Sequence, residues 1–112
     1  MRIREVEALI GISKKNIRFY EQEGLLTPNR SEGNSYRDYA PEDIRRLKQI
    51  KLLRKLDMPI PEIREILAGT LSLPVAARRH IVRLEGQIDN LEQARQLCGM
   101  IAQDSVSMNT LD

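Results

Sequence analysis

Apolar residues recur every three or four positions along most of this chain, which predicts a mainly α-helical protein. The first helical segment runs from about Arg4 to Ile10 and places Val6, Leu9 and Ile10 on one face. Gly11 ends it, since glycine takes the left-handed conformation of a tight turn without steric cost.

A second helix is predicted to begin after Ser13. The Ser13 hydroxyl is suited to cap it, and the helix runs to about Glu23, with Ile17 and Tyr20 facing inward before Gly24 closes it. Two short helices joined by a turn with glycine are typical of a helix-turn-helix.

A stretch rich in Ser, Gly and Asn follows from Arg30 to Ala40. Residues 33–35, Gly-Asn-Ser, predict the turn of a small hairpin, and Tyr36 and Tyr39 suit its strands. The hairpin would form a wing next to the second helix.

Two further helices are expected after this wing. Pro41 favours the first position of a third helix, and a fourth runs from Pro61 through Leu67 to Gly69. The apolar positions of the third helix recur at spacings of three and comprise Ile44, Leu47, Ile50, Leu53 and Leu56.

One long helix is predicted from about Val75 to Gln103. Its apolar positions follow the 4-3-4-3 spacing of a coiled-coil seam, which favours pairing with another helix. The seam residues are Ala77, Ile81, Leu84, Ile88 and Leu91, with Cys98 near the seam further along.

Composition narrows the class of protein. The 112 residues suit one domain with an appended element, and 30% charged against 41% apolar residues indicates a folded, water-soluble chain. No apolar run approaches the roughly 20 residues that span a bilayer, and the charged start is unlike a signal peptide, so a cytoplasmic location without membrane is expected. The single Cys98 and single His80 exclude an internal disulfide and a four-ligand zinc site within one chain.

Charge is unevenly distributed. Residues 1–60 carry 13 Lys and Arg against 9 Asp and Glu, a net +4, whereas residues 61–112 carry 5 against 7, a net −2. The cations Lys14, Lys15 and Arg18 stand at the front of the second helix, where base and phosphate contacts are made in helix-turn-helix proteins. The side chains that can project away from the apolar face are those of Lys14, Asn16, Arg18 and Glu21. Any soluble helix, however, has a charged outer face.

The wing strengthens the DNA-binding interpretation. Its guanidinium and phenol groups are suited to phosphate oxygens and belong to Arg30, Tyr36, Arg37 and Tyr39.

With these elements in this order, the chain resembles the MerR family of bacterial transcriptional regulators. The resemblance rests on REVEALIGISKKNIRFYEQEGLL, the wing ending in YRDY, PEDIRRLKQIKLLRKLDMPIPEIREIL and the long last helix. It implies a winged helix-turn-helix with a β-hairpin wing over residues 1–70, a linker at 71–74, a dimerisation helix at 75–104 and a flexible tail at 105–112. Such proteins pair through an antiparallel coiled coil of the long helices.

The resemblance also implies a role for particular residues. Lys15 and Arg18 would enter the major groove, Tyr20 would lie at the DNA backbone, and Arg54 would add a phosphate contact to those of the wing. The DNA-binding set is thus Ser13, Lys14, Lys15, Arg18, Tyr20, Arg30, Tyr36, Arg37, Tyr39 and Arg54. The expected partners are double-stranded palindromic promoter DNA, a second copy of the chain and RNA polymerase at the same promoter, and the DNA would be bent and untwisted.

The sequence departs from the family pattern in places. Ser35 stands where the wing often carries glycine, and Pro61 removes an N–H donor at the start of the fourth helix. No cofactor or metal is expected. Cys98 is interpreted as a small buried apolar residue, with a sensing thiol as the alternative, and His80 as an exposed helix residue.

Two other functional classes fit the sequence less well. A helical protein-interaction adaptor with the same fold has no need for cations at all the groove and wing positions. An enzyme is disfavoured because the sole Cys and His are far apart and no phosphate loop or nucleophile motif stands out. The effector, the DNA site, the sign of regulation and the presence of a further effector domain stay open.

Overall fold

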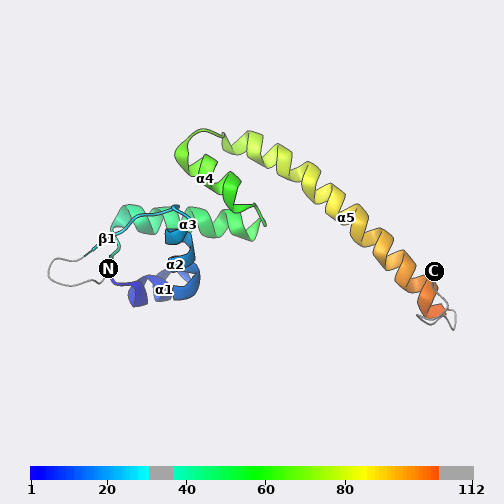
Figure 1. Ribbon diagram of the computed structural model, residues 1–112, viewed down its shortest axis with the longest axis horizontal. Coiled ribbons are helices and arrows are strands. Elements are labelled where there is room, and N and C mark those ends of the chain that lie inside the picture. Colours follow the sequence, from blue (N-terminus) through cyan, green and yellow to red (C-terminus); the bar gives the residue numbers. More distant parts are fainter. Residues whose placement is uncertain (31–36, 104–112) are drawn as a thin grey trace. The chain divides into compact units, whose positions relative to one another are not determined.

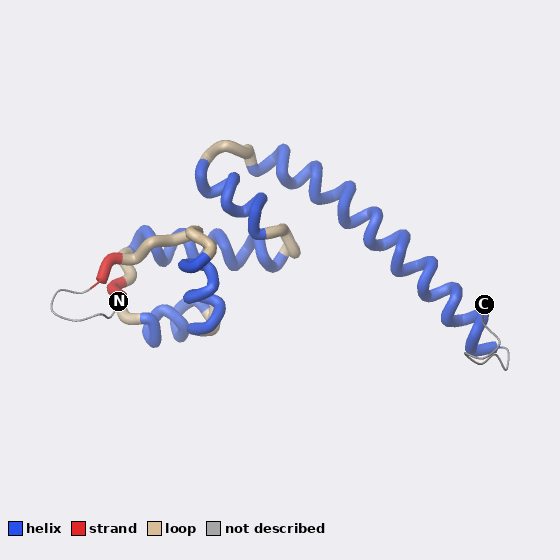
Figure 2. Tube along the Cα trace, in the orientation of Figure 1, coloured by secondary structure: helices blue, strands red, loops and turns tan. Residues whose placement is uncertain are grey.

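The computed structural model describes residues 1–30 and 37–103. Within them the chain forms helices joined by short connections and one two-stranded antiparallel ribbon (Figures 1 and 2). The elements are α1 (Ile3–Ile10), α2 (Lys14–Gln22), β1 (Asn29–Arg30), β2 (Arg37–Asp38), α3 (Pro41–Lys55), α4 (Ile60–Ala68) and α5 (Leu73–Gln103). The chain divides into two compact units, residues 1–73 and 74–112.

The predicted helix-turn-helix is present as α1 and α2, which pack against each other. Gly11 caps α1 in the left-handed conformation, with φ of 79°, and its N–H donates to the Glu7 carbonyl. The Ser13 hydroxyl accepts the backbone N–H of Asn16 at 3.2 Å and caps α2. Both caps predicted from residue type are therefore confirmed.

The core of the first unit lies between α1, α2, α3, α4 and the segments that connect them. Nine large side chains are fully buried there, and each contributes about 1.5–3 kcal/mol by leaving water. They are Val6, Ile17, Leu25, Leu26, Tyr39, Leu47, Ile50, Met58 and Ile63.

Two residues expected on inward faces are exposed. Leu9 is 56% exposed because α1 buries the side on which Val6 and Ile10 lie, and Leu9 falls outside that narrow stripe. Leu56 is 48% exposed because it follows the last residue of α3, and the turn at Asp57 brings Met58 into the core instead. Both inward assignments were wrong.

The base of the expected wing hairpin is present, but Tyr39, which was expected on a strand, lies just after β2. Asn29 pairs with Asp38 and Arg30 with Arg37 in an antiparallel register. Next to the ribbon, the backbone N–H of Tyr39 donates to the Met1 carbonyl at 2.8 Å and holds the wing base to the segment before α1. The predicted turn at residues 33–35 and Tyr36 lie outside the described residues.

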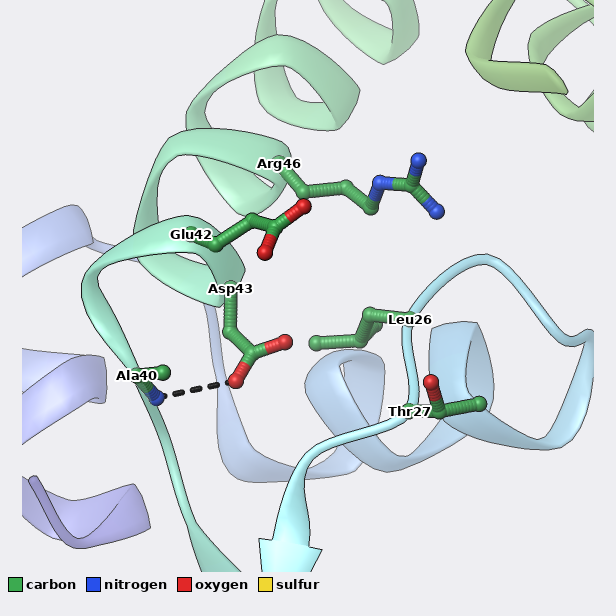
Figure 3. A pocket seen from close by; sticks show the side chains of 6 residues that line it. All are labelled: Leu26, Thr27, Ala40, Glu42, Asp43 and Arg46. Atoms are coloured by element: carbon green, nitrogen blue, oxygen red, sulfur yellow. Dashed lines mark hydrogen bonds between the residues drawn. The ribbon is translucent and has the colours of Figure 1, made fainter.

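Helices α3 and α4 complete the first unit. The Asp43 carboxylate accepts the backbone N–H of Ala40 at 2.8 Å and caps α3, as Figure 3 shows. After α3, Asp57 turns the chain with a positive φ of 63°, and α4 begins one residue before the expected Pro61. Gly69 ends α4 in the left-handed conformation, as predicted.

The second unit is built on α5, which starts two residues before the predicted Val75 and ends at the predicted Gln103. With 31 residues it is roughly 46 Å long at 1.5 Å per residue. Beyond its first turns, its side chains are exposed nearly throughout.

Candidate nucleic-acid interface

The outer face of α2 carries the predicted groove-reading residues. Lys15 and Arg18 are exposed and Lys14 is half-buried, whereas Ile17 and Tyr20 are buried on the opposite side of the same helix. Burial of the apolar face in the core therefore directs the cations outward. Ser13 fixes the start of α2 at Lys14, so these cations lie in the first turns of the helix.

Glu21 departs from this outward arrangement. Its carboxylate points to the wing base, where one oxygen accepts Arg37 Nε at 2.5 Å and the other accepts the Tyr39 hydroxyl at 2.9 Å. The expectation that Glu21 projects outward was wrong, because Arg37 of β2 and Tyr39, the residue that follows this strand, both donate to its carboxylate. Glu21 thus fixes the angle between the second helix and the wing, a role that sequence analysis missed.

The two tyrosines of the predicted site are largely internal. Tyr39 is 2% exposed, and its burial, together with the hydrogen bond to Glu21, raises the pKa of its hydroxyl above the usual value. The hydroxyl therefore stays protonated and serves as a donor inside the protein. The Tyr20 side chain is buried and lies edge-on to Phe19, with ring centroids 5.7 Å apart. Direct DNA contacts by either tyrosine stay predictions.

Arg37 and Arg54 already have partners in the protein. Arg37 is held by Glu21, and Arg54 donates from Nη1 to the Met58 carbonyl at 2.9 Å, across the turn that follows α3. A phosphate contact by either residue stays a prediction, and each would have to share or exchange its present partner. The side chain of Arg30, like Tyr36, lies outside what the structure describes.

Two further arginines, which sequence analysis passed over, tie the unit together. Arg46 donates to the Leu25 carbonyl at 3.1 Å, and Arg64 donates to the Glu23 carbonyl at 2.8 Å and to its carboxylate at 3.0 Å. Their partners lie 21 and 41 residues away along the chain. No local pattern could have indicated these bonds, which brace the end of α2 from α3 and α4.

A polar hollow of about 310 Å³ lies beside the start of α3 (Figure 3). Its charged lining residues are Glu42, Asp43 and Arg46, but Asp43 caps the helix and Arg46 binds a backbone carbonyl. The hollow is therefore lined by groups that already stabilise the fold.

The predicted seam of α5 is exposed within the single chain. Ile81, Ile88 and Leu91 are 52%, 54% and 70% exposed, Ala77 is exposed and Leu84 is half-buried. A helix that leaves an apolar stripe in water is stabilised when another surface covers it. This exposure is what an unpaired dimerisation helix would show.

The two residues considered for sensing differ from expectation. Cys98 is exposed, so its interpretation as a buried residue was wrong for the single chain. His80 was expected on the surface but is only 4% exposed, and Arg83 Nη1 lies 2.7 Å from its Nδ1. Since a guanidinium only donates, Nδ1 is the acceptor of this hydrogen bond.

Within residues 1–30 and 37–103, no three His, Cys, Asp or Glu side chains gather as they would around a metal ion. The same part of the chain contains no helix that is both long and apolar enough to cross a membrane.

A capped helix-turn-helix with an outward cationic second helix, latched to a β-ribbon, defines a winged helix-turn-helix protein. Comparison with known proteins specifies the class. The family described as "MerR HTH family regulatory protein" matches residues 1–70, and "MerR, DNA binding" matches residues 44–97. The chain belongs to the MerR family, which consists of DNA-binding transcriptional regulators rather than enzymes.

Individual relatives agree with this assignment. The chain is 35% identical over 95 residues to the HTH-type transcriptional regulator HmrR of Sinorhizobium medicae, covering 79% of this chain and 65% of the relative. It is 34% identical over 94 residues to the nodulation protein NolA of a Bradyrhizobium species, covering 84% of this chain but 40% of that protein. The chain thus spans less than two thirds of the length of these relatives.

Solved structures share the fold. The transcription regulator PbrR691 from Ralstonia metallidurans CH34, in complex with lead(II), has a TM-score of 0.79 and 29% identity, with 98% of this chain and 93% of that chain covered. HiNmlR, a MerR family regulator lacking the sensor domain and bound to promoter DNA, has a TM-score of 0.58 and 24% identity, with 91% and 78% covered.

Proposed function

We propose that this chain is a transcriptional regulator that binds a palindromic promoter site as a homodimer and distorts the DNA. The observation that carries the proposal is the outer face of α2, where Lys15 and Arg18 are exposed while Glu21 holds the wing base alongside. One rigid unit therefore offers cations both to the major groove and to the flanking backbone.

The cations of this interface and Tyr36 keep the roles assigned from the sequence, whereas Ser13, Tyr20 and Tyr39 are proposed to act through the fold. Arg18 is proposed to read a base, since arginine pairs with guanine through two hydrogen bonds, and Lys14 and Lys15 to support it. Arg30, Tyr36, Arg37 and Arg54 are proposed as phosphate contacts. Ser13 acts by capping α2, and Tyr20 and Tyr39 act by placing α2 and the wing.

Pairing of two chains is proposed to occur through α5 in an antiparallel coiled coil. The exposed apolar stripe from Ile81 to Leu91 supports this. A two-fold dimer matches a palindrome because its two recognition helices enter successive turns of the same groove. RNA polymerase at the same promoter, in the cytoplasm, is the proposed further partner.

Some relatives are named as heavy-metal-dependent regulators, and PbrR691 was solved with lead(II). This chain contains one cysteine and one histidine.

The test is footprinting of the purified chain on the DNA upstream of its own coding region and on a randomised pool, across a salt series. A protected palindrome whose affinity falls steeply with salt is expected, because each neutralised phosphate releases counterions. Absence of protection in both DNAs would instead favour a protein-interaction adaptor.

The variant Arg18→Ala tests whether this residue reads a base. It is expected to reduce the preference for the palindrome over unrelated DNA by about 1–3 kcal/mol, as loss of one base contact does. Lys48→Ala, which removes an exposed cation of α3, is the control and should keep the preference. An Arg18→Ala protein with unchanged sequence preference would refute base reading by this residue.

A further inference from the structure

An apolar groove lies on the first unit where α1 packs against α3. It consists of two open hollows of about 350 and 340 Å³ that share Leu9, so the apolar surface continues past this residue. We call their lining the α1–α3 groove. One hollow is lined by Leu9, Ile10, Lys48, Lys51, Leu52 and Lys55, and the other by Met1, Leu9, Tyr39, Pro41 and Ile44.

Two leucines of the groove are open to water. Leu9 of α1 and Leu52 of α3 are both more than half exposed, and they line the same hollow from the two helices. A single exposed leucine is ordinary on a protein surface. Apolar side chains that gather in a hollow edged by charged residues are instead typical of an interaction site. The groove therefore favours a partner with apolar side chains.

The charges along the groove have one sign. Lys51 is engaged, since its Nζ donates to the Ile10 carbonyl at 2.6 Å at the end of α1. Lys48 and Lys55 are exposed and form no ion pair within residues 1–30 and 37–103. Among the described residues, no Asp or Glu lines either hollow. Because like charges repel along this edge, the groove favours an acidic partner.

The spacing of these residues fits a helix. Lys48 and Lys55 are seven residues apart on α3, which corresponds to about 10 Å along the helix axis, and Leu52 lies between them. A helix that binds in a groove contacts it through residues at positions i, i+3, i+4 and i+7. Its first and last contact residues would face the two lysines, and the middle ones would face the leucines.

We propose that the α1–α3 groove binds an acidic amphipathic helix of another protein. Two carboxylates of this helix, seven residues apart, pair with Lys48 and Lys55, and its apolar side chains cover Leu9 and Leu52. The inference goes beyond the proposed function, because it adds a protein partner to the DNA.

The other anionic partners fit the groove less well. The phosphates of DNA would pair with the lysines but would leave Leu9 and Leu52 uncovered. A lipid surface is flat, whereas the groove is hollowed between two helices. The predicted groove-reading residues Lys15 and Arg18 line neither hollow, so the partner helix and the DNA would bind through different side chains.

The experiment selects binders to the full chain from a displayed library of peptides of about 15 residues, near the length at which isolated helices become stable. Fluorescence anisotropy then measures the enriched peptides on the wild type, on Leu9→Ser and on Lys48→Glu combined with Lys55→Glu. The control, Lys15→Glu combined with Arg18→Glu, changes the charge equally at the predicted DNA interface. All replaced side chains are exposed, so thermal unfolding should stay at the wild-type level.

Enriched peptides are expected to carry two acidic residues seven positions apart with apolar residues between them. Leu9→Ser and the double variant at Lys48 and Lys55 should each weaken their binding by about tenfold or more, as loss of a central contact does. The control should bind them nearly as the wild type does. A peptide whose two acidic residues are replaced by lysine should prefer the double variant, which a merely indirect effect of the lysines would not produce.

Three results would overturn the inference. The first is a selection without peptides that depend on Leu9 and the two lysines, including one whose peptides are lost in the Lys15→Glu, Arg18→Glu control. The second is a palindrome affinity whose slope against log salt falls by about 0.9 for each lysine in Lys48→Ala combined with Lys55→Ala, which would assign the groove to DNA phosphates.

The third is binding of the wild type to vesicles of phosphatidylcholine and phosphatidylglycerol that Leu9→Ser abolishes, which would assign the groove to a lipid surface. Failure of the wild type to bind any DNA while it binds the acidic peptides would overturn the proposed function and leave this inference standing.

Discussion

At the scale of single residues, Asp57 holds a conformation that its side chain makes costly. Its φ of 63° lies in the left-handed region, which costs a residue with a Cβ about 1–2 kcal/mol, somewhat less for Asp and Asn. The turn is kept because the Asp57 N–H donates to the Arg54 carbonyl at 2.9 Å and the Met58 N–H to the Leu53 carbonyl at 3.1 Å. These bonds bring Met58 into the core.

Substitution of Asp57 should therefore separate backbone strain from side-chain contacts. Asp57→Gly is expected to raise the free energy of unfolding by about 0.5 kcal/mol, since relief of strain outweighs the greater entropy of glycine in the unfolded chain. Asp57→Val should lower it by about 1–2 kcal/mol, because a β-branched residue fits this region poorly. Urea unfolding at equal protein concentration measures both, and a valine variant as stable as the wild type would show that the turn relaxes.

At the scale of elements, the wing depends on one carboxylate of the second helix. Glu21 receives Arg37 and Tyr39 together and is mostly buried, so its charge is poorly solvated without them. Tyr39 is also held by its backbone bond to Met1. The orientation of β2 against α2 therefore rests on few, charge-assisted bonds.

Glu21→Gln is expected to lower the free energy of unfolding by about 1.5–3 kcal/mol, the range for hydrogen bonds to charged groups. It should also strengthen binding to unrelated DNA, because Arg37 loses its competing carboxylate and a negative charge leaves the interface. Urea unfolding and anisotropy measure the two effects.

Tyr39→Phe is the matched control, since it removes the hydroxyl bond to Glu21 without changing charge. Its stability should fall by about 0.5–1.5 kcal/mol while its affinity for unrelated DNA stays at the wild-type level. Equal gains in DNA affinity for both variants would trace the effect to a loosened wing rather than to the released arginine.

The elements also show what the sequence could predict. Caps and ends follow from residue type within a few positions, so Ser13, Gly11 and Gly69 were assigned correctly. The direction of Glu21 depends on a strand 16 residues away, and the exposure of Leu56 depends on a turn that no periodicity encodes. Local signals predicted the helices, whereas long-range donors and turns decided which side chains form the site.

The candidate site likewise has a part that local sequence signals predict and a part that depends on long-range packing. The outward cations of α2 followed from the burial of Ile17 and Tyr20, a local amphipathic pattern. The bracing of α2 by Arg46 and Arg64 depends on where α3 and α4 lie. The angle at which two helices cross is set by the packing of their side chains, so the spacing of residues along the sequence does not predict it.

At the scale of the whole molecule, α5 has an exposed apolar stripe that a second chain would cover. Most helical stability in proteins comes from packing of an apolar face rather than from helix propensity. Beyond its first turns, α5 leaves Ile81, Ile88 and Leu91 largely in water. Two copies paired along these residues would bury the stripe on both helices. We therefore expect the folding of α5 to be coupled to dimerisation.

Leu84→Lys combined with Ile88→Lys should therefore yield monomers in sedimentation, because the four introduced charges would face each other across the pair. The control, Gln93→Lys combined with Gln96→Lys, adds the same charge to the same helix outside the seam and should stay dimeric. A dimer binds its second half-site at high effective concentration. The affinity of the monomer for the palindrome should therefore fall by a factor of about 10² or more. Its affinity for a single half-site should change little. A seam variant that remains dimeric would show that the pairing surface lies elsewhere on α5, and a monomer that still prefers the palindrome would show that recognition does not depend on pairing.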